Sequence, residues 1–221
     1  MSTSHIQFSV DDGVAWLTLN RPDKRNALSS EMLRAIVDGL ADLAGREDVR
    51  ALGVRGSGGS FCSGGDLASV KNADGTESTE YRALAEAALT AIREFPRPTA
   101  ALVEGACIGA GILIALECDV RFATPGSKFA IPAVRYGLPI SPRGLARLVE
   151  VVGSGQAHRF FLSAMTMLAP EAREVGMVEW CGDDAAAAAA EFLSEVAKGD
   201  PASVAATREM IRRAATTPLT P

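Results

Sequence analysis

Two glycine-rich turns constrain the fold of this chain more than any other feature of its sequence. The first, FCSGGDL, covers residues 61–67, and the second, GACIGAG, covers residues 105–111. Each turn follows a short apolar segment typical of a buried strand and precedes a segment with helical spacing of apolar residues. Strands that alternate with helices in this way predict an α/β fold.

The apolar patterns around the two turns predict the remaining elements. Alternation over residues 6–10 and a second apolar run over 14–19 flank the turn signal at 11–13, which predicts a β-hairpin. Ser29 or Ser30 can cap the following helix, and Gly45 ends it. Further strands are expected at 51–55, 99–103, 120–122 and 128–131. Further helices are expected at 80–95, after the second turn, at 142–152 and 154–162, from Pro170, at 185–190 and at 201–215.

The composition excludes several classes of function. The chain has 221 residues, enough for one compact domain, and 22 Lys and Arg against 27 Asp and Glu give it a net charge of −5. An acidic chain without a basic run is a poor nucleic-acid binder, because phosphate contacts need clustered Lys and Arg. With only two histidines, His5 and His158, a His-rich metal site cannot be built, so no metal is expected.

The cysteines and the N-terminus indicate the cellular setting. None of the four cysteines lies in a C-x-x-C pair, and their spacing fits neither a zinc site nor a disulfide framework, so a reduced, cytoplasmic setting is expected. The first residues lack the basic start and apolar core of a signal peptide. No apolar run is long enough to cross a bilayer, so no membrane partner is expected.

The glycine-rich turns themselves suggest a chemistry. A helix N-terminus exposes unpaired N–H groups with positive dipole character, and two such ends aimed at one point would stabilise a developing oxyanion. Glycine would let a ligand approach the backbone closely. The alternative is that these glycines only turn the chain and let strand and helix pack tightly, and spacing alone does not separate the two interpretations.

Several motifs, in their order and spacing, resemble the enoyl-CoA hydratase/isomerase (crotonase) family. The resemblance extends from about Ile6 to Ala215 and is specific for the family, although not for one reaction within it. The motifs are RPDKRNAL at 21–28, FCSGGDL at 61–67, EGACIGAG at 104–111, CD at 118–119, SKFAIP at 127–132, ARL at 146–148 and AREVGMV at 172–178.

This resemblance implies a fold, a ligand and a site. The fold would be a crotonase-like spiral of repeated strand–strand–helix units, with a core at 1–152 that holds the acyl-CoA site and a C-terminal helical region at 153–221 that is shorter than usual. The chain would form a homotrimer or a dimer of trimers. The substrate would be an acyl-CoA thioester, with no cofactor beyond that coenzyme A. The thioester oxygen would lie between the N–H groups of Gly65 and Ala110, where the family usually has glycine at the second position. The residues that would line the CoA site are Lys24, Arg25, Ala27, Ser63, Gly64, Asp66 and Leu67.

The sequence departs from the family at two acids. Hydratases of the family add water with two glutamates, and the matching positions here are Leu113 and Ala133. Neither side chain can move a proton, although general acid–base catalysis typically supplies a factor of about 10²–10⁴. Isomerases commonly need the second glutamate, so Ala133 also disfavours that reaction.

Other side chains could take the place of these two acids. Glu86 lies on the helix before Pro96, where some relatives place a catalytic side chain, and a solvated surface glutamate is the alternative. Tyr136 and Ser141 follow Ala133 in a loop that would wall the acyl pocket, where Leu113 would also lie. The remaining candidates are interpreted as structural: a paired carboxylate at Glu117, architectural acids at Asp66 and Asp119, packing thiols at Cys62 and Cys107, and a packed or surface histidine at His158.

Two functions of different class remain open. The first is an enzyme, a lyase or isomerase of fatty acid metabolism, that stabilises a thioester enolate in a backbone oxyanion hole. The second is an impaired auxiliary member that binds an acyl-CoA without turning it over, which the missing glutamates and the short C-terminal region favour. A nicotinamide dehydrogenase is disfavoured because no Tyr-x-x-x-Lys pair is present, and a phosphate loop because no Gly-Lys-Ser/Thr follows residues 56–65.

Overall fold

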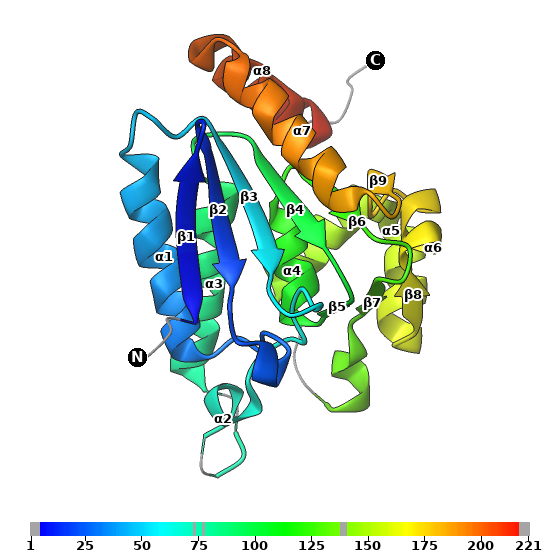
Figure 1. Cartoon of the computed structure of the whole chain (residues 1–221). Helices are drawn as coiled ribbons and strands as arrows, with labels where there is room; N and C mark the ends of the chain where they lie inside the picture. Colours follow the sequence, from blue (N-terminus) through cyan, green and yellow to red (C-terminus); the bar gives the residue numbers. More distant parts are fainter. Residues whose placement is uncertain (1–4, 73, 77, 138–140, 217–221) are drawn as a thin grey trace.

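The computed structural model describes residues 5–72, 74–76, 78–137 and 141–216 and contains two sheets (Figure 1). The larger sheet has six strands in the order β1-β2-β3-β4-β6-β9, and the smaller has the order β5-β7-β8. Helices cover both faces of the larger sheet (Figure 1). This arrangement confirms the α/β class that the alternating strands and helices predict.

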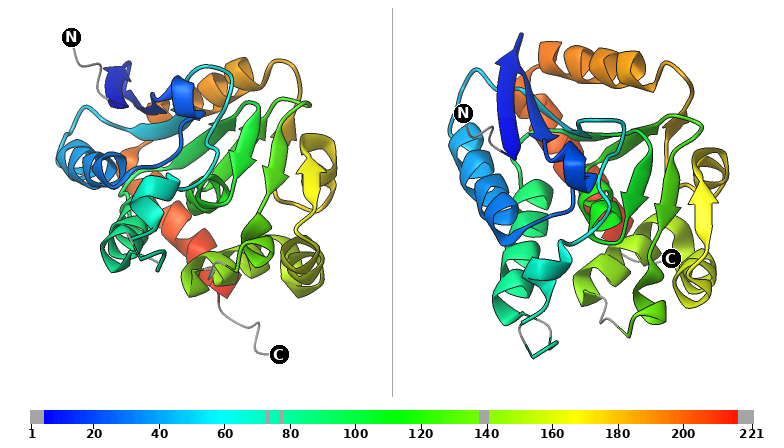
Figure 2. Two further views of the ribbon diagram at one scale, coloured as in Figure 1. Left: turned by 90° about the horizontal axis from the view of Figure 1, so that it is seen from below. Right: turned by 60° about the horizontal axis from the view of Figure 1, so that its bottom comes forward.

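The chain begins with the predicted hairpin. β1 (Ile6–Asp11) and β2 (Val14–Leu19) are antiparallel, with Ile6 opposite Leu19. The turn between them holds Asp12 at φ 44° and Gly13 at φ 80°, the left-handed conformation that two-residue hairpin turns require. Figure 2 shows this hairpin and α1 (Ser30–Ala44) at one side of the molecule, and α5 (Pro142–Ser163) and α6 (Ala169–Glu174) at the other.

Parallel strands β3 (Ala51–Gly56), β4 (Thr99–Val103), β6 (Val120–Ala123) and β9 (Trp180–Cys181) complete the larger sheet. Alternate residues of β4 point to opposite faces. Ala101 and Val103 belong to the core under α1 and α3 (Thr79–Arg93), whereas Ala100 and Leu102 pack with α7 (Ala185–Lys198). Burial on both faces explains why β4 is apolar after its first residue.

The smaller sheet contains elements that the sequence analysis did not assign. β5 (Ala106–Ile108) pairs in parallel with β7 (Lys128–Ala130), which pairs antiparallel with β8 (Thr166–Leu168). Residues 105–111 were predicted to turn directly into a helix, whereas β5 intervenes and α4 (Ala110–Glu117) follows it. The units β4–β5–α4 and β6–β7–α5 are the strand–strand–helix repeats that the resemblance implies.

The helices confirm most of the predicted starts and stops. Ser29, rather than Ser30, caps α1 by accepting from Met32 N. The two helices predicted to meet near Val152 form α5, which Gly153 interrupts at φ 76°. A short helix, α2 (Leu67–Val70), begins after the cap Asp66 and was not predicted.

The C-terminal region contributes to the core. Both β8 and β9 follow residue 152; β8 is an edge strand of the smaller sheet and β9 an edge strand of the larger one. The described chain ends with α8 (Pro201–Thr216). The domain boundary at 152 stays a prediction. Within the described residues, no helix combines the length and apolarity that crossing a membrane needs.

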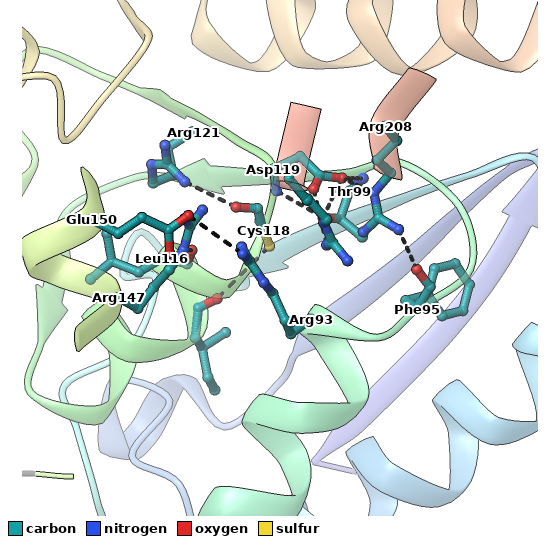
Figure 3. Close-up of polar contacts among 12 residues, drawn as sticks. Arg93, Phe95, Thr99, Leu116, Cys118, Asp119, Arg121, Arg147, Glu150 and Arg208 are labelled. Atoms are coloured by element: carbon teal, nitrogen blue, oxygen red, sulfur yellow. Dashed lines mark hydrogen bonds and ion pairs between the residues drawn. The ribbon is translucent and has the colours of Figure 1, made fainter. Parts of the chain in front are cut away.

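An ion-pair network joins α8 to the loops that follow α3 and α4 (Figure 3). Asp119 Oδ2 accepts from Thr99 N at 2.8 Å and from Arg208 Nε at 2.6 Å, while Oδ1 accepts from Arg212 Nη2 at 3.1 Å. Arg208 Nη1 also donates to Phe95 O at 2.6 Å. The architectural role predicted for Asp119 therefore has a clear basis, because one carboxylate balances two largely buried guanidinium groups.

A second acid organises the charges beside this network. Glu150 of α5 lies 2.6 Å from Arg147 Nη1 and 3.5 Å from Arg93 Nη2 (Figure 3). Burial, together with the neighbouring Arg93 guanidinium, lowers the pKa of Arg147. Glu150 thus ties α3 to α5 on the side of the molecule where Asp119 ties the sheet to α8.

We expect Asp119→Ala to lower the free energy of unfolding by about 3 kcal/mol, because it leaves the charges of Arg208 and Arg212 without their acid. Urea denaturation followed by circular dichroism measures this loss. Asp38→Ala, on the exposed face of α1, is the control and is expected to change stability by no more than about 0.5 kcal/mol. Equal stability of the two variants would contradict the structural role of Asp119.

Candidate active site

The two glycine-rich turns are joined through their backbones. Cys62 N donates to Ala106 O, and Ile108 N donates to Cys62 O, each at 2.8 Å. These bonds form an isolated parallel bridge between Cys62 and Cys107. Cys62 therefore acts as one more strand position beside β5, and segments more than forty residues apart in the chain lie side by side.

Glycines allow this close approach. A Cβ at Gly111 would lie 2.8 Å from both the Cβ and the backbone O of Cys62, a distance that real Cβ atoms do not reach. Gly64 adopts φ 108°, and a Cβ there would lie 3.3 Å from Ile108 O and 3.9 Å from Ala110 N. Glycine at 64 and 111 is thus needed to bring the turns together, and not only to reverse the chain.

Neighbouring bonds fix the peptides that carry the two predicted donors. Leu28 N donates to Gly64 O and Asp66 N donates to Leu28 O, each at 2.8 Å, so the strand-like segment at Leu28 holds both sides of Gly65. Ala110 is the first residue of α4, where N–H groups have no partner within the helix. Within the described chain, neither the Gly65 nor the Ala110 N–H donates a backbone hydrogen bond.

A cavity of about 450 Å³ opens beside these turns. Its walls come from both turns, α2, α3, the start of α4 and the segment that leads into α5. The predicted site residues that line it are Ser63, Gly64, Gly65, Leu67, Glu86, Ala110, Leu113, Ala133, Tyr136 and Ser141. The predicted residues outside this lining are Lys24, Arg25, Ala27 and Asp66.

The cavity wall is apolar at the two positions where hydratases of the family have glutamates. Leu113 and Ala133 both line the cavity, and Leu113 packs tightly against Gly144 of α5, where a Cβ would lie 2.6 Å from a Leu113 methyl carbon. Glu86 of α3 is half-buried and is the one carboxylate among the described lining residues. Its role in proton transfer stays a prediction.

The sequence model of a family described as enoyl-CoA hydratase/isomerase matches residues 9–221. This chain belongs to the enoyl-CoA hydratase/isomerase family. A crotonyl-CoA hydratase from Syntrophomonas wolfei is 32% identical over 179 residues, which cover 80% of this chain and 69% of that protein. The human ethylmalonyl-CoA decarboxylase is 34% identical over 170 residues, covering 76% of this chain and 55% of that protein.

A solved structure confirms the crotonase-like fold. A Legionella pneumophila protein described as an enoyl-CoA hydratase/isomerase (crotonase) superposes with a TM-score of 0.90 at 25% identity, and the match covers 99% of this chain and 86% of that one. The fold class and the family implied by the sequence motifs are therefore both confirmed.

Several polar residues of the hydratase/isomerase motifs support the first turn, and all of those described below except Ser63 lie outside the cavity lining. Asp66 forms an ion pair with Arg21 and caps α2 by accepting from Ala68 N at 3.1 Å. Burial by itself would raise the pKa of Asp66, but the hydrogen bond from Arg21 outweighs this effect and holds the pKa below its usual value. Ser63 N donates to Arg25 O at 2.9 Å and Ser63 Oγ to Lys24 O at 3.1 Å, which ties the 21–28 loop to the first turn.

The side chains interpreted as structural, Glu117, Cys62, Cys107 and His158, lie outside the cavity lining. Glu117 is buried and accepts from Arg143 Nε at 3.0 Å, as expected of a paired carboxylate. Burial raises the pKa of Cys62 to about 12 and that of Cys107 well above its usual value, so both remain neutral packing thiols. His158 is exposed, and its Nδ1 lies 2.7 Å from Ser154 O.

The sequence analysis missed Tyr81 as a site residue. Tyr81 belongs to the first turn of α3, is buried and lines the cavity. Its place in the apolar stripe of α3 made it indistinguishable from a core residue by spacing. Within the described chain, no three His, Cys, Asp or Glu side chains gather closely enough to hold a metal ion.

We expect Gly111→Ala to lower the free energy of unfolding by about 1–3 kcal/mol, because the added methyl group has no room against Cys62. The substitution should also separate the two turns and lower the affinity for any ligand that binds between them. Thermal unfolding and ligand titration measure the two effects.

Gly155→Ala is the matched control for this variant, since a Cβ at this helical position meets no atom within 4 Å. This control is expected to be neutral or to stabilise the protein by up to about 1 kcal/mol. A Gly111→Ala protein as stable as the control would contradict the tight packing of the turns.

Proposed function

We propose that this member of the family is an enzyme that processes an acyl-CoA thioester and stabilises its enolate with the N–H groups of Gly65 and Ala110. The observation that supports this function is the pairing of the two glycine-rich turns at the wall of one cavity, with both N–H groups free of backbone partners in the described chain. Backbone donors of this kind stabilise developing negative charge on oxygen, and losing one typically costs about 10²–10³ in kcat.

The lining suggests how protons move in such a reaction. Leu113 and Ala133 provide no acid or base, whereas Glu86 is half-buried in the cavity wall. We infer that Glu86 exchanges a proton with the acyl group or with the enolate. A single carboxyl suits a reaction with one proton transfer better than the addition of water, which uses two acids in the hydratases of the family.

Decarboxylation is a second candidate, and the apolar walls at Leu113 and Ala133 favour it. A thioester that carries a carboxylate on its α-carbon loses CO₂ by breaking the bond between that carbon and the carboxylate. The electron pair of this bond forms the same enolate without any base, and one proton then gives the saturated acyl-CoA. An apolar wall favours this step because it solvates the carboxylate poorly. The similarity to an ethylmalonyl-CoA decarboxylase is consistent with this reaction.

An auxiliary role is the alternative of another class. A member that binds an acyl-CoA without turnover would keep the backbone donors and the cavity, and it would not need Glu86. This alternative predicts that acyl-CoA thioesters bind to the protein without any chemical change.

The wider setting of the site is also part of the proposal. We infer that Lys24, Arg25 and Ala27 contact the coenzyme A, because bonds to Ser63 hold their loop against the first turn. We also infer a homotrimer or a dimer of trimers in the cytoplasm. Exposed apolar side chains on the C-terminal helices, such as Leu162 at 70% and Ile211 at 65% exposure, support self-association. Four free cysteines fit a reducing compartment.

The test is the turnover of two substrate types by the purified protein. A short 2-enoyl-CoA and a malonyl-type CoA thioester are incubated separately, and the products are identified by mass spectrometry. Gain of one water indicates hydration, and loss of one CO₂ indicates decarboxylation. An unchanged thioester that nevertheless binds in calorimetry supports the auxiliary role, and absence of binding contradicts the whole proposal.

We expect Glu86→Gln to lower the turnover of the active substrate by about 10²–10⁴, because an amide cannot exchange the proton. Binding of the thioester should change little, since the side chain keeps its size. Glu94→Gln, an exposed residue at the end of α3, is the matched control. Equal turnover by the two variants would show that Glu86 carries no proton.

A further inference from the structure

The phenol oxygen of Tyr81 is a buried polar atom without a partner among the residues that the structure describes. Tyr81 is 6% exposed, and its Oη forms no hydrogen bond within the described chain. A buried hydroxyl without a hydrogen bond costs free energy, about 1–3 kcal/mol, which a phenylalanine in the same space would avoid. Unpaired buried groups of this kind are rare in folded proteins and call for an explanation.

The position of this oxygen connects it to the first glycine-rich turn. A Cβ added to Gly65 would lie 2.6 Å from Tyr81 Oη and 2.6 Å from Val70 Cγ2, so both side chains close over the Gly65 backbone. Tyr81 also lines the cavity that holds the two turns. A side chain at position 65 would therefore displace the tip of the Tyr81 ring.

Standard bond lengths limit the distance between Oη and the predicted donor. A Cβ lies about 2.5 Å from the nitrogen of its own residue, so Tyr81 Oη lies within about 5 Å of Gly65 N. An N–H···O bond of about 2.9 Å and an O–H···O bond of about 2.7 Å can together span this separation. One ligand oxygen can therefore accept from both groups.

The phenol is suited to donate and not to ionise. Burial is the main cause that raises the pKa of Tyr81 above its usual value, and the nearby Cys62 and Asp66 add to the effect. The hydroxyl thus keeps its proton throughout the physiological range.

We propose that the Tyr81 O–H donates a hydrogen bond to the thioester oxygen of a bound acyl-CoA, as a third donor beside the N–H groups of Gly65 and Ala110. This inference rests on the proposed function, since it assumes that a thioester oxygen lies at the paired turns. Tyr81 transfers no proton in this role. Its hydrogen bond strengthens as negative charge develops on the oxygen, and the electron pair of the enolate remains on the ligand.

The test is Tyr81→Phe, which removes only the hydroxyl. Butyryl-CoA with ¹³C at the thioester carbonyl is the probe, and difference infrared spectroscopy measures the carbonyl stretch in the bound state. Hydrogen-bond donors polarise the carbonyl and lower this frequency, so we expect the frequency to rise in the variant toward that of free butyryl-CoA. Affinity for butyryl-CoA should fall by about 10-fold, and turnover of the active substrate by about 100-fold.

Stability separates a ligand role from a structural one. Because Oη has no partner in the described chain, we expect Tyr81→Phe to melt at the same temperature as the wild type or higher. Thr79→Val is the matched control, since it removes an exposed hydroxyl from the same turn of α3 outside the cavity. This control should leave the carbonyl frequency, affinity and turnover at wild-type values.

The outcomes are distinguishable. If the wild type binds butyryl-CoA and Tyr81→Phe shows the same carbonyl frequency and affinity, the third donor is overturned and the proposed function stands. If Tyr81→Phe melts well below the wild type, its hydroxyl has a structural partner and the inference is wrong. If the wild type binds no acyl-CoA, the proposed function fails and the inference fails with it.

Discussion

The pairing of Cys62 with β5 is the contact on which the site depends. Its two hydrogen bonds of 2.8 Å join the end of one strand–helix unit to the start of another, and the bridge residues Cys62 and Cys107 are fully buried. Side chains larger than hydrogen at 64 or 111 would force the two segments apart. Because Gly109 alone separates β5 from α4, this pairing also fixes where the N-terminus of that helix lies relative to the Gly65 peptide.

Polar residues hold the first turn from the other side. Asn26 is completely buried at φ 57°, and its Nδ2 donates to Ser57 O at 2.9 Å and to Ser60 O at 2.7 Å. Its Oδ1 accepts from Arg21 N at 2.7 Å, and Arg21 in turn pairs with Asp66. The loop motif that the resemblance assigns to the CoA site therefore also has a structural task, which is to position the glycine-rich turn against β5.

Local signals predicted much of this fold. The alternation around the hairpin and the cap at Ser29 depend only on neighbouring residues, and the structure bears them out. β5, β8 and β9 were missed because short strands form through partners that lie far away in the sequence. Tyr81 was missed for the same reason. Whether its hydroxyl has a hydrogen-bond partner depends on residues that lie far away in the sequence. The paired carboxylate at Glu117 was predicted, but its partner Arg143 was found only in three dimensions.

In the proposed site the backbone supplies the oxyanion donors and the side chains supply the rest of the chemistry, so one fold can suit several reactions. The proposed oxyanion donors at positions 65 and 110 are N–H groups, which every residue except proline supplies, so these donors by themselves do not select one reaction. The reaction then depends on the few side chains that face the acyl group. In this chain the cavity lining is apolar at 113 and 133, acidic at 86 and phenolic at 81. In the proposed enzyme such a set would stabilise an enolate but would offer few ways to form one with a base, and this imbalance would favour substrates that reach the enolate by losing a leaving group of their own.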